Sequence, residues 1–398
     1  MVCRGTNPGF AGGLGMDRRP DLDWLRVLAF GLLILYHAGF AWTGWGWHLE
    51  SDETLPWLAE AMRFTNRWRI PLIYMVAGGA IVLALGQRDA GAFAMDRVRR
   101  LLLPLVFGVL VIVPPQVYLE QHSKGSFPGS FLQWLPHAYE RDNLAWNHLW
   151  FVAYVLLLTF ALLPVFLWAR TPYGRAVQAG IAKVMARAGL HWLMAVPIAL
   201  AMLLLGPITR NVNYLVGDWY GIASAALLML YGGFIFNAPE MLAVLNRQCW
   251  IAVAVGTVAF FALDLLIFQA APGAHVRLFG VPVYAPLSAI NMIGWLFAAV
   301  GLANRYLQQR PRFLSWATEA LYPFYMIHQT VTVITVYWLV RWHVPAVPAW
   351  LLAVLSTFGV TFLIYAWAVR PWAWVRPLFG LKPRRPRSAA LPAQTTAL

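Results

Sequence analysis

The stretch that decides the fold is residues 22–42, which read LDWLRVLAFGLLILYHAGFAW. Apart from Asp23, Arg26 and His37, its residues are apolar or small. A helix that crosses the hydrocarbon core of a bilayer needs about 20 such residues. The stretch therefore predicts a transmembrane helix, and this helix carries three ionisable groups.

Nine further stretches have the same apolar character. The ten predicted spans are 22–42, 70–85, 101–119, 148–168, 192–205, 219–236, 250–268, 286–306, 320–340 and 350–369. The whole chain is 60% hydrophobic and 12% charged, whereas soluble domains are about 45–50% apolar and about 25% charged. This composition excludes a soluble enzyme, a disordered chain and a nucleic-acid-binding domain. We predict an all-α, polytopic integral membrane protein with about ten transmembrane helices.

The positive charges give an independent prediction of orientation. When the N-terminus is placed in the cytoplasm, the inner segments carry 21 Lys and Arg residues and the outer segments carry 8. Positive residues favour the cytoplasmic side of a membrane protein. We therefore expect both termini to be cytoplasmic, and the net charge of +14 needs no nucleic acid as a partner.

The predicted organisation has three parts: a flexible N-terminal segment (1–20), a transmembrane domain (21–373) and a basic cytoplasmic tail (374–398). The first fifteen residues lack the pattern of a signal peptide, and either Met1 or Met16 is an acceptable start. Two cysteines, Cys3 and Cys249, are too few for a disulfide framework. No metal-binding motif is present in the sequence, and we expect no metal site.

Three ionisable residues of the first span share one face of the helix. His37 follows Arg26 by eleven positions, which is about 20° past three full turns and a rise of roughly 16 Å. Asp23 lies near the same stripe. Such groups normally face the interior of a bundle, and imidazole is suited to act as a base near neutral pH. The alternative is that Arg26 reaches the cytoplasmic surface and His37 makes a structural hydrogen bond.

A basic cluster, Asp96-Arg97-Val-Arg99-Arg100, precedes the third span. Positive-inside anchoring explains it simply. The alternative is phosphate binding, because Arg97 and Arg100 are neighbours on one helix face and guanidinium groups bind phosphates bidentately. An acyl-CoA held there by its phosphates would bring its thioester, at the end of an arm on the order of 20 Å long, near the depth of His37.

Other histidines are weaker candidates for chemistry. His48 lies with Trp47 and Glu50 in an outer aromatic segment that suits stacking on sugar rings or a simple interfacial belt. His148 begins the fourth span and His328 lies in the ninth, where a single histidine is more often structural. Asp264, inside the seventh span, needs a partner that the sequence does not identify.

Taken together, the Arg26-x10-His37 pair, the Arg97-x-x-Arg100 pair and the ten-span layout resemble the membrane-bound acyltransferase family three. The resemblance is strongest to its glucans biosynthesis protein C branch, the glucan succinyltransferases. The other matching stretches are Trp47-His48, residues 69–78, Asn143-Leu-Ala-Trp146 with His148-Leu-Trp150-Phe151, and residues 321–328. One departure is in the second span, which has Ile73-Tyr74 and Ala77-Gly78 where the family often has a Phe-Phe stretch ending in Ser-Gly.

The resemblance implies O-acylation of an extracytoplasmic glycan, such as a periplasmic glucan, at the bacterial inner membrane, with cytoplasmic acetyl-CoA or succinyl-CoA as co-substrate. It makes His37 the catalytic base and Arg26 its motif partner, and Asp23 is the third catalytic candidate. The donor-binding residues would be Arg97, Arg100 and the adjacent Arg99. The acceptor-binding candidates are Trp47, His48, Glu50, Arg69, Trp146, His148 and His328.

A transporter is the competing prediction. Asp23, Arg26, His37 and Asp264 are intramembrane ionisable residues of the kind that couple transport to ions. Transporters of this type often consist of two related halves, and the sequence shows no internal repeat. The sequence predicts neither the oligomeric state nor whether the acyl group first resides on the enzyme.

Overall fold

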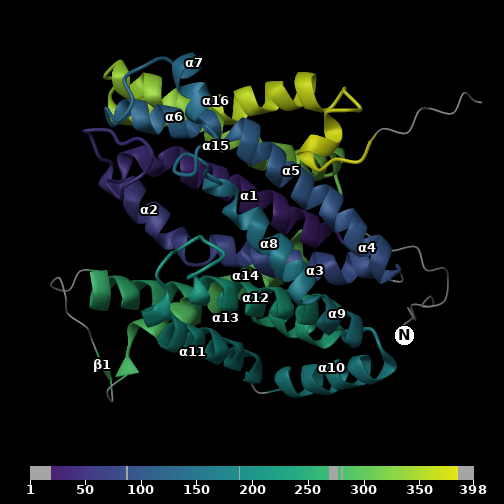
Figure 1. Ribbon diagram of the computed structural model, residues 1–398. Helices are drawn as coiled ribbons and strands as arrows, with labels where there is room; N and C mark the ends of the chain where they lie inside the picture. Colours follow the sequence, from purple (N-terminus) through teal and green to yellow (C-terminus); the bar gives the residue numbers. More distant parts are fainter. Residues whose placement is uncertain (1–18, 87, 188, 269–276, 279–280, 384–398) are drawn as a thin grey trace, which may run out of the picture.

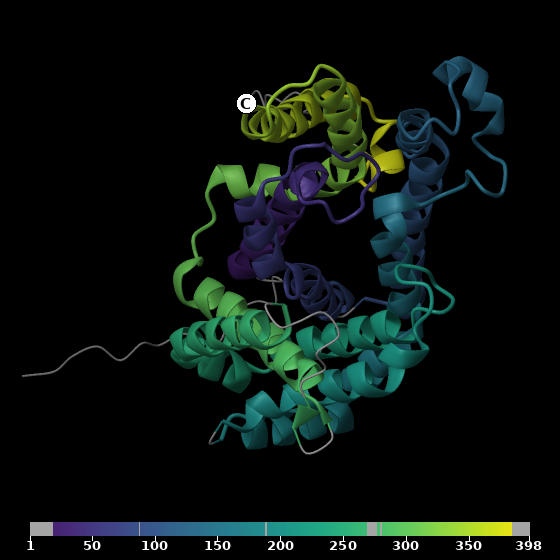
Figure 2. The same ribbon diagram turned by 90° about the vertical axis from the view of Figure 1, so that its left-hand side faces the viewer.

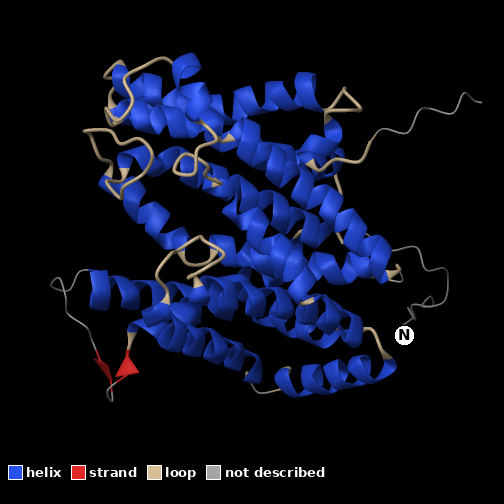
Figure 3. Ribbon diagram, viewed as in Figure 1, coloured by secondary structure: helices blue, strands red, loops and turns tan. Residues whose placement is uncertain are grey.

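Helices make up most of the part of the chain that the structure describes (Figure 3). The computed structural model describes residues 19–86, 88–187, 189–268, 277–278 and 281–383. The only strands in these ranges are β1 (Arg277–Leu278) and β2 (Val281–Pro282), a short antiparallel hairpin in which Arg277 pairs with Pro282. The prediction of an all-α membrane protein is confirmed. The predicted flexible segment, up to residue 18, and the last fifteen residues of the tail lie outside the described residues.

Sixteen α-helices form the body of the described structure. They are α1 (Pro20–Gly39), α2 (Pro56–Asn66), α3 (Arg69–Leu85), α4 (Ala90–Arg97), α5 (Leu103–Phe107), α6 (Pro114–Ser123), α7 (Phe131–Trp134), α8 (Trp150–Ala161), α9 (Leu163–Ala169), α10 (Pro172–Met185), α11 (Ala195–Leu205), α12 (Trp219–Asn237), α13 (Pro239–Leu263), α14 (Tyr284–Tyr306), α15 (Arg312–Arg341) and α16 (Ala346–Leu363). Short π-helical turns continue several of them: η2 (Val98–Leu102), η3 (Gly108–Ile112), η8 (Asp264–Phe268) and η9 (Ile364–Val369).

Eight helices in the described ranges are long and apolar enough to cross a membrane, and the bent pair α8–α9, with an angle of 50°, makes nine. These nine match nine of the ten predicted spans. The remaining prediction, 320–340, lies in α15, a 30-residue helix that is not among the nine. His328, Gln329, Thr330 and Thr332 lower its apolarity, and three of these side chains are buried. The structure thus has a helix at each of the ten predicted positions.

The helices are stacked in layers with α1 and α3 near the middle (Figure 1). In the view turned by 90°, α15 and α16 lie on one side of α1 and α3, and α11 to α14 lie on the other side (Figure 2). The first turn of α1 has Pro20 with Asp21 and Asp23, which suits the positive end of the helix dipole. The start of α15 is held beside it, because the Trp24 indole donates to the Gln309 carbonyl at 3.0 Å. Thus α1 and α15 start at the same end of the bundle.

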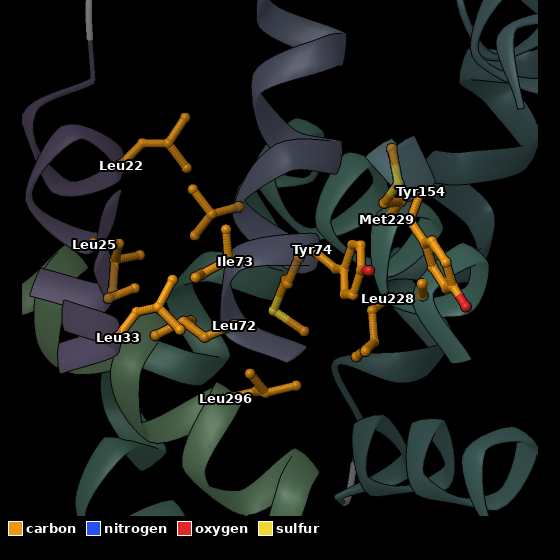
Figure 4. Packing of buried hydrophobic residues seen from close by; sticks show 14 of the residues in the cluster. Leu22, Leu25, Leu33, Leu72, Ile73, Tyr74, Tyr154, Leu228, Met229 and Leu296 are labelled. Atoms are coloured by element: carbon orange, nitrogen blue, oxygen red, sulfur yellow. The ribbon is translucent and has the colours of Figure 1, made fainter. Parts of the chain in front are cut away.

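Glycines let α3 and α12 approach closely. A Cβ at Gly78 would overlap the Met229 carbonyl oxygen, and a Cβ at Gly232 would overlap that of Met75. Small residues play this role at helix contacts in membranes. Leucines of α1, including Leu33, pack against the other side of α3 (Figure 4). The position of α3 between α1 and α12 is therefore fixed on two sides.

Large apolar side chains cover much of the outer surface. Trp367 is 72% exposed, Leu355 is 68% exposed and Val111 is 53% exposed. Exposed apolar patches on this scale mark a membrane or protein interaction surface. Together with the candidate spans, they identify a multi-pass membrane protein.

The residues that follow α16 return to the bundle. Arg376 is 8% exposed, pairs with Glu319 at 3.1 Å and donates to the Lys382 carbonyl at 2.7 Å. Phe379 packs against Phe107 with ring centroids 5.4 Å apart. The described part of the predicted tail, residues 374–383, is thus anchored on the helices.

Candidate active site

Two histidines from distant parts of the chain meet inside the bundle. His37, near the end of α1, and His328, in the middle of α15, approach with Nδ1 of His37 2.8 Å from Nε2 of His328. Their rings are stacked with centroids 5.1 Å apart. The expected common face of α1 therefore turns its imidazole toward α15 and away from lipid. The sequence placed His328 with the acceptor residues, and the structure places it against the catalytic candidate.

The hydrogen bonds around this pair assign its protons. Nδ1 of His328 lies 2.6 Å from the carbonyl oxygen of Tyr325, which can only accept, so this nitrogen carries the hydrogen. In a neutral ring the other nitrogen, Nε2, is then an acceptor, and Nδ1 of His37 must donate to it. Nε2 of His37 is left with a lone pair. His328 thus presents His37 as the tautomer that a base requires.

A small cavity of about 20 Å³ adjoins His37. Its walls come from α1, α3, α8, α15 and the 3₁₀ turn η5 (Asn147–Leu149), which precedes α8 and carries His148. The lining residues are Leu33, His37, Ile70, Ile73, His148, Trp150, Phe151 and Tyr325. A group of about the size of one water molecule fits there. The site is therefore a narrow, mainly apolar space beside imidazole groups, where hydrogen bonds and charges act strongly.

His148 is the third imidazole of the site. Its Nε2 donates to the Met326 carbonyl at 3.1 Å, and the Tyr325 hydroxyl donates to the carbonyl oxygen of His148. Nδ1 of His148 is buried without a hydrogen-bond partner among the described residues. A buried nitrogen of this kind is expected to accept a hydrogen bond from a ligand or a water.

Arg69 brings a buried positive charge close to this cavity. It is 5% exposed, its guanidinium lies over the Tyr36 ring at 3.1 Å from the centroid, and Nη1 donates to Asn66 at 3.2 Å. In the part of the chain that the structure describes, no carboxylate pairs with it. Tyr36 precedes His37, and Ile70, which follows Arg69, lines the cavity. The guanidinium is therefore a buried cation without a counter-charge.

A polar network lies on the other side of α15. His48 contacts Glu120 through Nδ1, and the Gln329 amide donates to Nε2 of His48 at 3.1 Å. Gln329 also contacts Gln116 at 3.2 Å, to which Asn147 donates at 2.9 Å. Because Gln329 follows His328, this network adjoins the histidine pair. Sequence reasoning missed Gln116, Glu120 and Gln329, although polar residues within predicted apolar spans were a signal that could have identified Gln116 and Gln329.

Aromatic rings connect the two groups. Phe40 stacks on His37 with centroids 6.1 Å apart and on Trp47 at 5.7 Å. Two other acceptor candidates lie elsewhere in this arrangement: Glu50 accepts from the Gly46 amide within its own loop at 2.7 Å, and Trp146 packs against Tyr214. Trp47 and His48 are thus the outer residues that the structure links to His37.

The donor-binding candidates lie at the other end of the bundle, where the first turns of α1 also place the catalytic candidates Arg26 and Asp23, apart from His37 in the last turn. Arg26 pairs with Asp23 at 3.3 Å, and Arg310 lies 3.8 Å from the same carboxylate. Arg100 pairs with Asp96 at 2.8 Å, and Arg99 is exposed. Arg97 covers the Phe93 ring, and its Nε has no hydrogen-bond partner among the described residues.

Asp264, for which the sequence suggested no partner, lies at the start of η8, beyond the end of α13. Its carboxylate is 3.7 Å from Arg63, which follows the first span in sequence. Asp264 is therefore part of an ion pair at the end of the bundle, away from the histidine pair.

Comparison with known proteins supplies the family. The family model described as acyltransferase domain matches residues 19–366. Glucans biosynthesis protein C of Escherichia coli strain K12 is 26% identical over 150 residues, 36% of this chain and 37% of that protein. The same protein of Salmonella paratyphi B is 26% identical over 152 residues, 37% of this chain and 38% of that protein.

The alignments thus span little more than a third of these relatives. No solved structure matches the chain. The family model, in contrast, covers most of the chain and includes every residue of the histidine pair, the cavity and the polar network. The chain belongs to the acyltransferase domain family, and its candidate spans make it a multi-pass membrane member of that family.

Proposed function

We propose that the protein transfers an acyl group from an acyl-CoA to a hydroxyl group of a glycan, with His37 as the general base. The observation that carries this proposal is the lone pair on Nε2 of His37, which the hydrogen bonds through His328 to the Tyr325 carbonyl leave free. The names of the relatives support a glucan as the acceptor, and their bacterial sources support the inner membrane. Family membership and the absence of an internal repeat argue against a transporter.

The chemistry is a direct acyl transfer. Nε2 of His37 takes the proton of the glycan hydroxyl while its oxygen attacks the thioester carbonyl carbon. The C–S bond then breaks, and the proton on His37 passes to the departing thiolate, so that the products are an ester and free coenzyme A. The apolar walls of the cavity would limit access of water, which would otherwise hydrolyse the thioester.

The substrates are proposed to approach from opposite ends of the bundle. Arg97 and Arg100 would bind the phosphates of the acyl-CoA, with the Arg97 guanidinium free of a carboxylate partner among the described residues. Trp47 and His48 would contact the glycan, because ring stacking and hydrogen bonds connect them to His37 and Gln329. Both ends of the chain are then cytoplasmic, as the charge distribution predicts.

The acyl group is proposed to be succinyl. A succinyl group carries a carboxylate, and this carboxylate would neutralise the buried charge of Arg69, whereas an acetyl group offers no counter-charge. A buried cation without a partner is costly, so the donor that supplies one is favoured. The variant Arg69→Gln is expected to lose transfer from succinyl-CoA at least about tenfold more than transfer from acetyl-CoA. An equal loss with both donors would overturn the succinyl assignment.

The experiment that tests the function uses His37→Gln in a cell that lacks the native gene. Mass spectrometry of envelope glycans should show acylated glycan with the native chain and none with the variant, at equal amounts of folded protein in the membrane. Removal of a general base typically costs about 10²–10⁴-fold in rate. Normal glycan acylation by the variant would contradict the proposed role of His37.

A further inference from the structure

A second cavity in the described part of the chain is away from His37. Its volume is about 390 Å³, and it lies between the last turns of α3, α9 and α12, with α10 along one side. Its walls are mainly apolar, with Val82, Val165, Phe166, Leu230 and Phe234 contributing. A space of this size is typical of ligand pockets, and none of its lining residues belongs to the proposed reaction.

One end of this cavity is positively charged. Arg170 and Arg175 line it together with Gln178 and Asn237, and no Asp or Glu does. Arg170 donates only to the Arg88 carbonyl, at 3.1 Å, and Arg175 has no ion pair or hydrogen bond through its side chain within the described ranges. The side-chain amides of Gln178 and Asn237, in contrast, have hydrogen-bond partners within the protein. Gln178 donates to the Ala169 carbonyl at 2.9 Å and accepts from Asn237 at 3.4 Å.

The depth of the cavity follows from the helix ends. The candidate spans that wall it end at Leu85, Ala169 and Asn237, and residues at or next to these ends line the cavity. The ends of membrane helices lie where hydrocarbon meets the polar headgroups. The two arginines are therefore at headgroup depth, and the apolar walls extend from there into the hydrocarbon core.

We propose that this cavity binds an anionic phospholipid, with its phosphate between Arg170 and Arg175 and part of its acyl chains against Val82, Val165 and Leu230. Guanidinium groups form strong charge-assisted hydrogen bonds with phosphate. A coenzyme A fits less well, because its pantetheine arm has amide groups that these walls cannot pair. The bound lipid would brace α3, the helix that carries Arg69, against α9 and α12.

Lipid binding is tested on the full-length protein, purified in a neutral detergent and titrated with phosphatidylglycerol or phosphatidylcholine. Native mass spectrometry counts the bound lipids. The native chain should bind one phosphatidylglycerol at least about tenfold more tightly than phosphatidylcholine. The double variant Arg170→Gln/Arg175→Gln should lose this preference. The matched control is Arg141→Gln/Arg247→Gln, which removes two exposed arginines outside the cavity and should retain it.

A second variant tests the apolar part of the cavity. Leu230→Trp fills the space while both arginines remain, and it should abolish retention of the lipid. Equal binding of both lipids by the native chain, or an unchanged preference in the Arg170/Arg175 variant, would overturn the proposal. The proposal would also be overturned if the Arg170/Arg175 variant lost binding of coenzyme A but kept binding of the lipid. None of these measurements depends on acyl transfer, so their outcome is separate from the test of His37.

Discussion

His328 acts on the reaction through His37, and its replacement by leucine tests this role. Leucine removes the acceptor for the hydrogen on Nδ1 of His37 and keeps a side chain of similar bulk. A hydrogen bond of this kind contributes about 1–1.5 kcal/mol. Without it the ratio of the two tautomers of His37 shifts by up to about tenfold against the form with a lone pair on Nε2, and the fraction of His37 in that form falls several-fold.

The expected result is therefore a several-fold fall in kcat for His328→Leu, with about tenfold as its upper limit, and an unchanged KM for the acyl-CoA. His328→Gln is the matched control, because its side-chain carbonyl can still accept from Nδ1 of His37, and it should stay within about threefold of the native rate. His37→Gln should lose much more, about 10²–10⁴-fold. The loss of rate should therefore decrease in the order His37→Gln, His328→Leu, His328→Gln, and this order follows from the direction of the hydrogen bonds.

The assay measures release of free coenzyme A by the purified protein in lipid nanodiscs, with and without a glucan acceptor. Thermal unfolding of each variant separates a loss of rate from a loss of folded protein. A native kcat in His328→Leu would refute the tautomer argument. An equal loss in the leucine and glutamine variants would assign His328 to packing rather than to the positioning of His37.

Two further predictions concern the donor site and the helix packing. The variant Arg97→Ala/Arg100→Ala should weaken acyl-CoA binding at least about tenfold in a calorimetric titration, whereas Arg99→Ala, at the exposed position, should leave it unchanged; equal effects would contradict a specific phosphate site. Gly78→Val should lower the stability of the fold by about 3 kcal/mol or more, because the new side chain meets the backbone of α12. Gly31→Ala, where a Cβ meets nothing within 4 Å, is the control, and a similar melting temperature for both would contradict the argument.

Much of the framework was predictable because it depends on neighbours in sequence. Each of the ten apolar stretches is a helix, and nine of these meet the criteria for a span, since apolar length alone decides whether a segment is stable in hydrocarbon. α15 is the exception. Polar residues of this helix, among them His328, Gln329 and Thr332, lower its mean hydropathy. The side chains of these three are buried in the protein and not exposed to lipid.

The candidate site was predictable only in part. Helical geometry placed Arg26 and His37 on one face, and the ion pair between Arg26 and Asp23 agrees with that stripe. The role of His328 was missed, because 291 positions separate it from His37. The contact of Gln329 with His48, which links the outer network to the centre, was missed for the same reason, because 281 positions separate these two residues.

The sequence by itself determined that this chain folds as membrane helices, and where along the chain they lie, because hydrophobicity and helical period are properties of each segment. Only the tertiary structure decided which helices are neighbours. Lipid and protein interior are similarly apolar, so hydropathy does not specify the contact between two spans. Close approach at glycines such as Gly78 and Gly232 and a few buried hydrogen bonds specify it instead. For that reason the pairing of His37 with His328, and with it the free nitrogen proposed to act as the base, exists only in the folded protein.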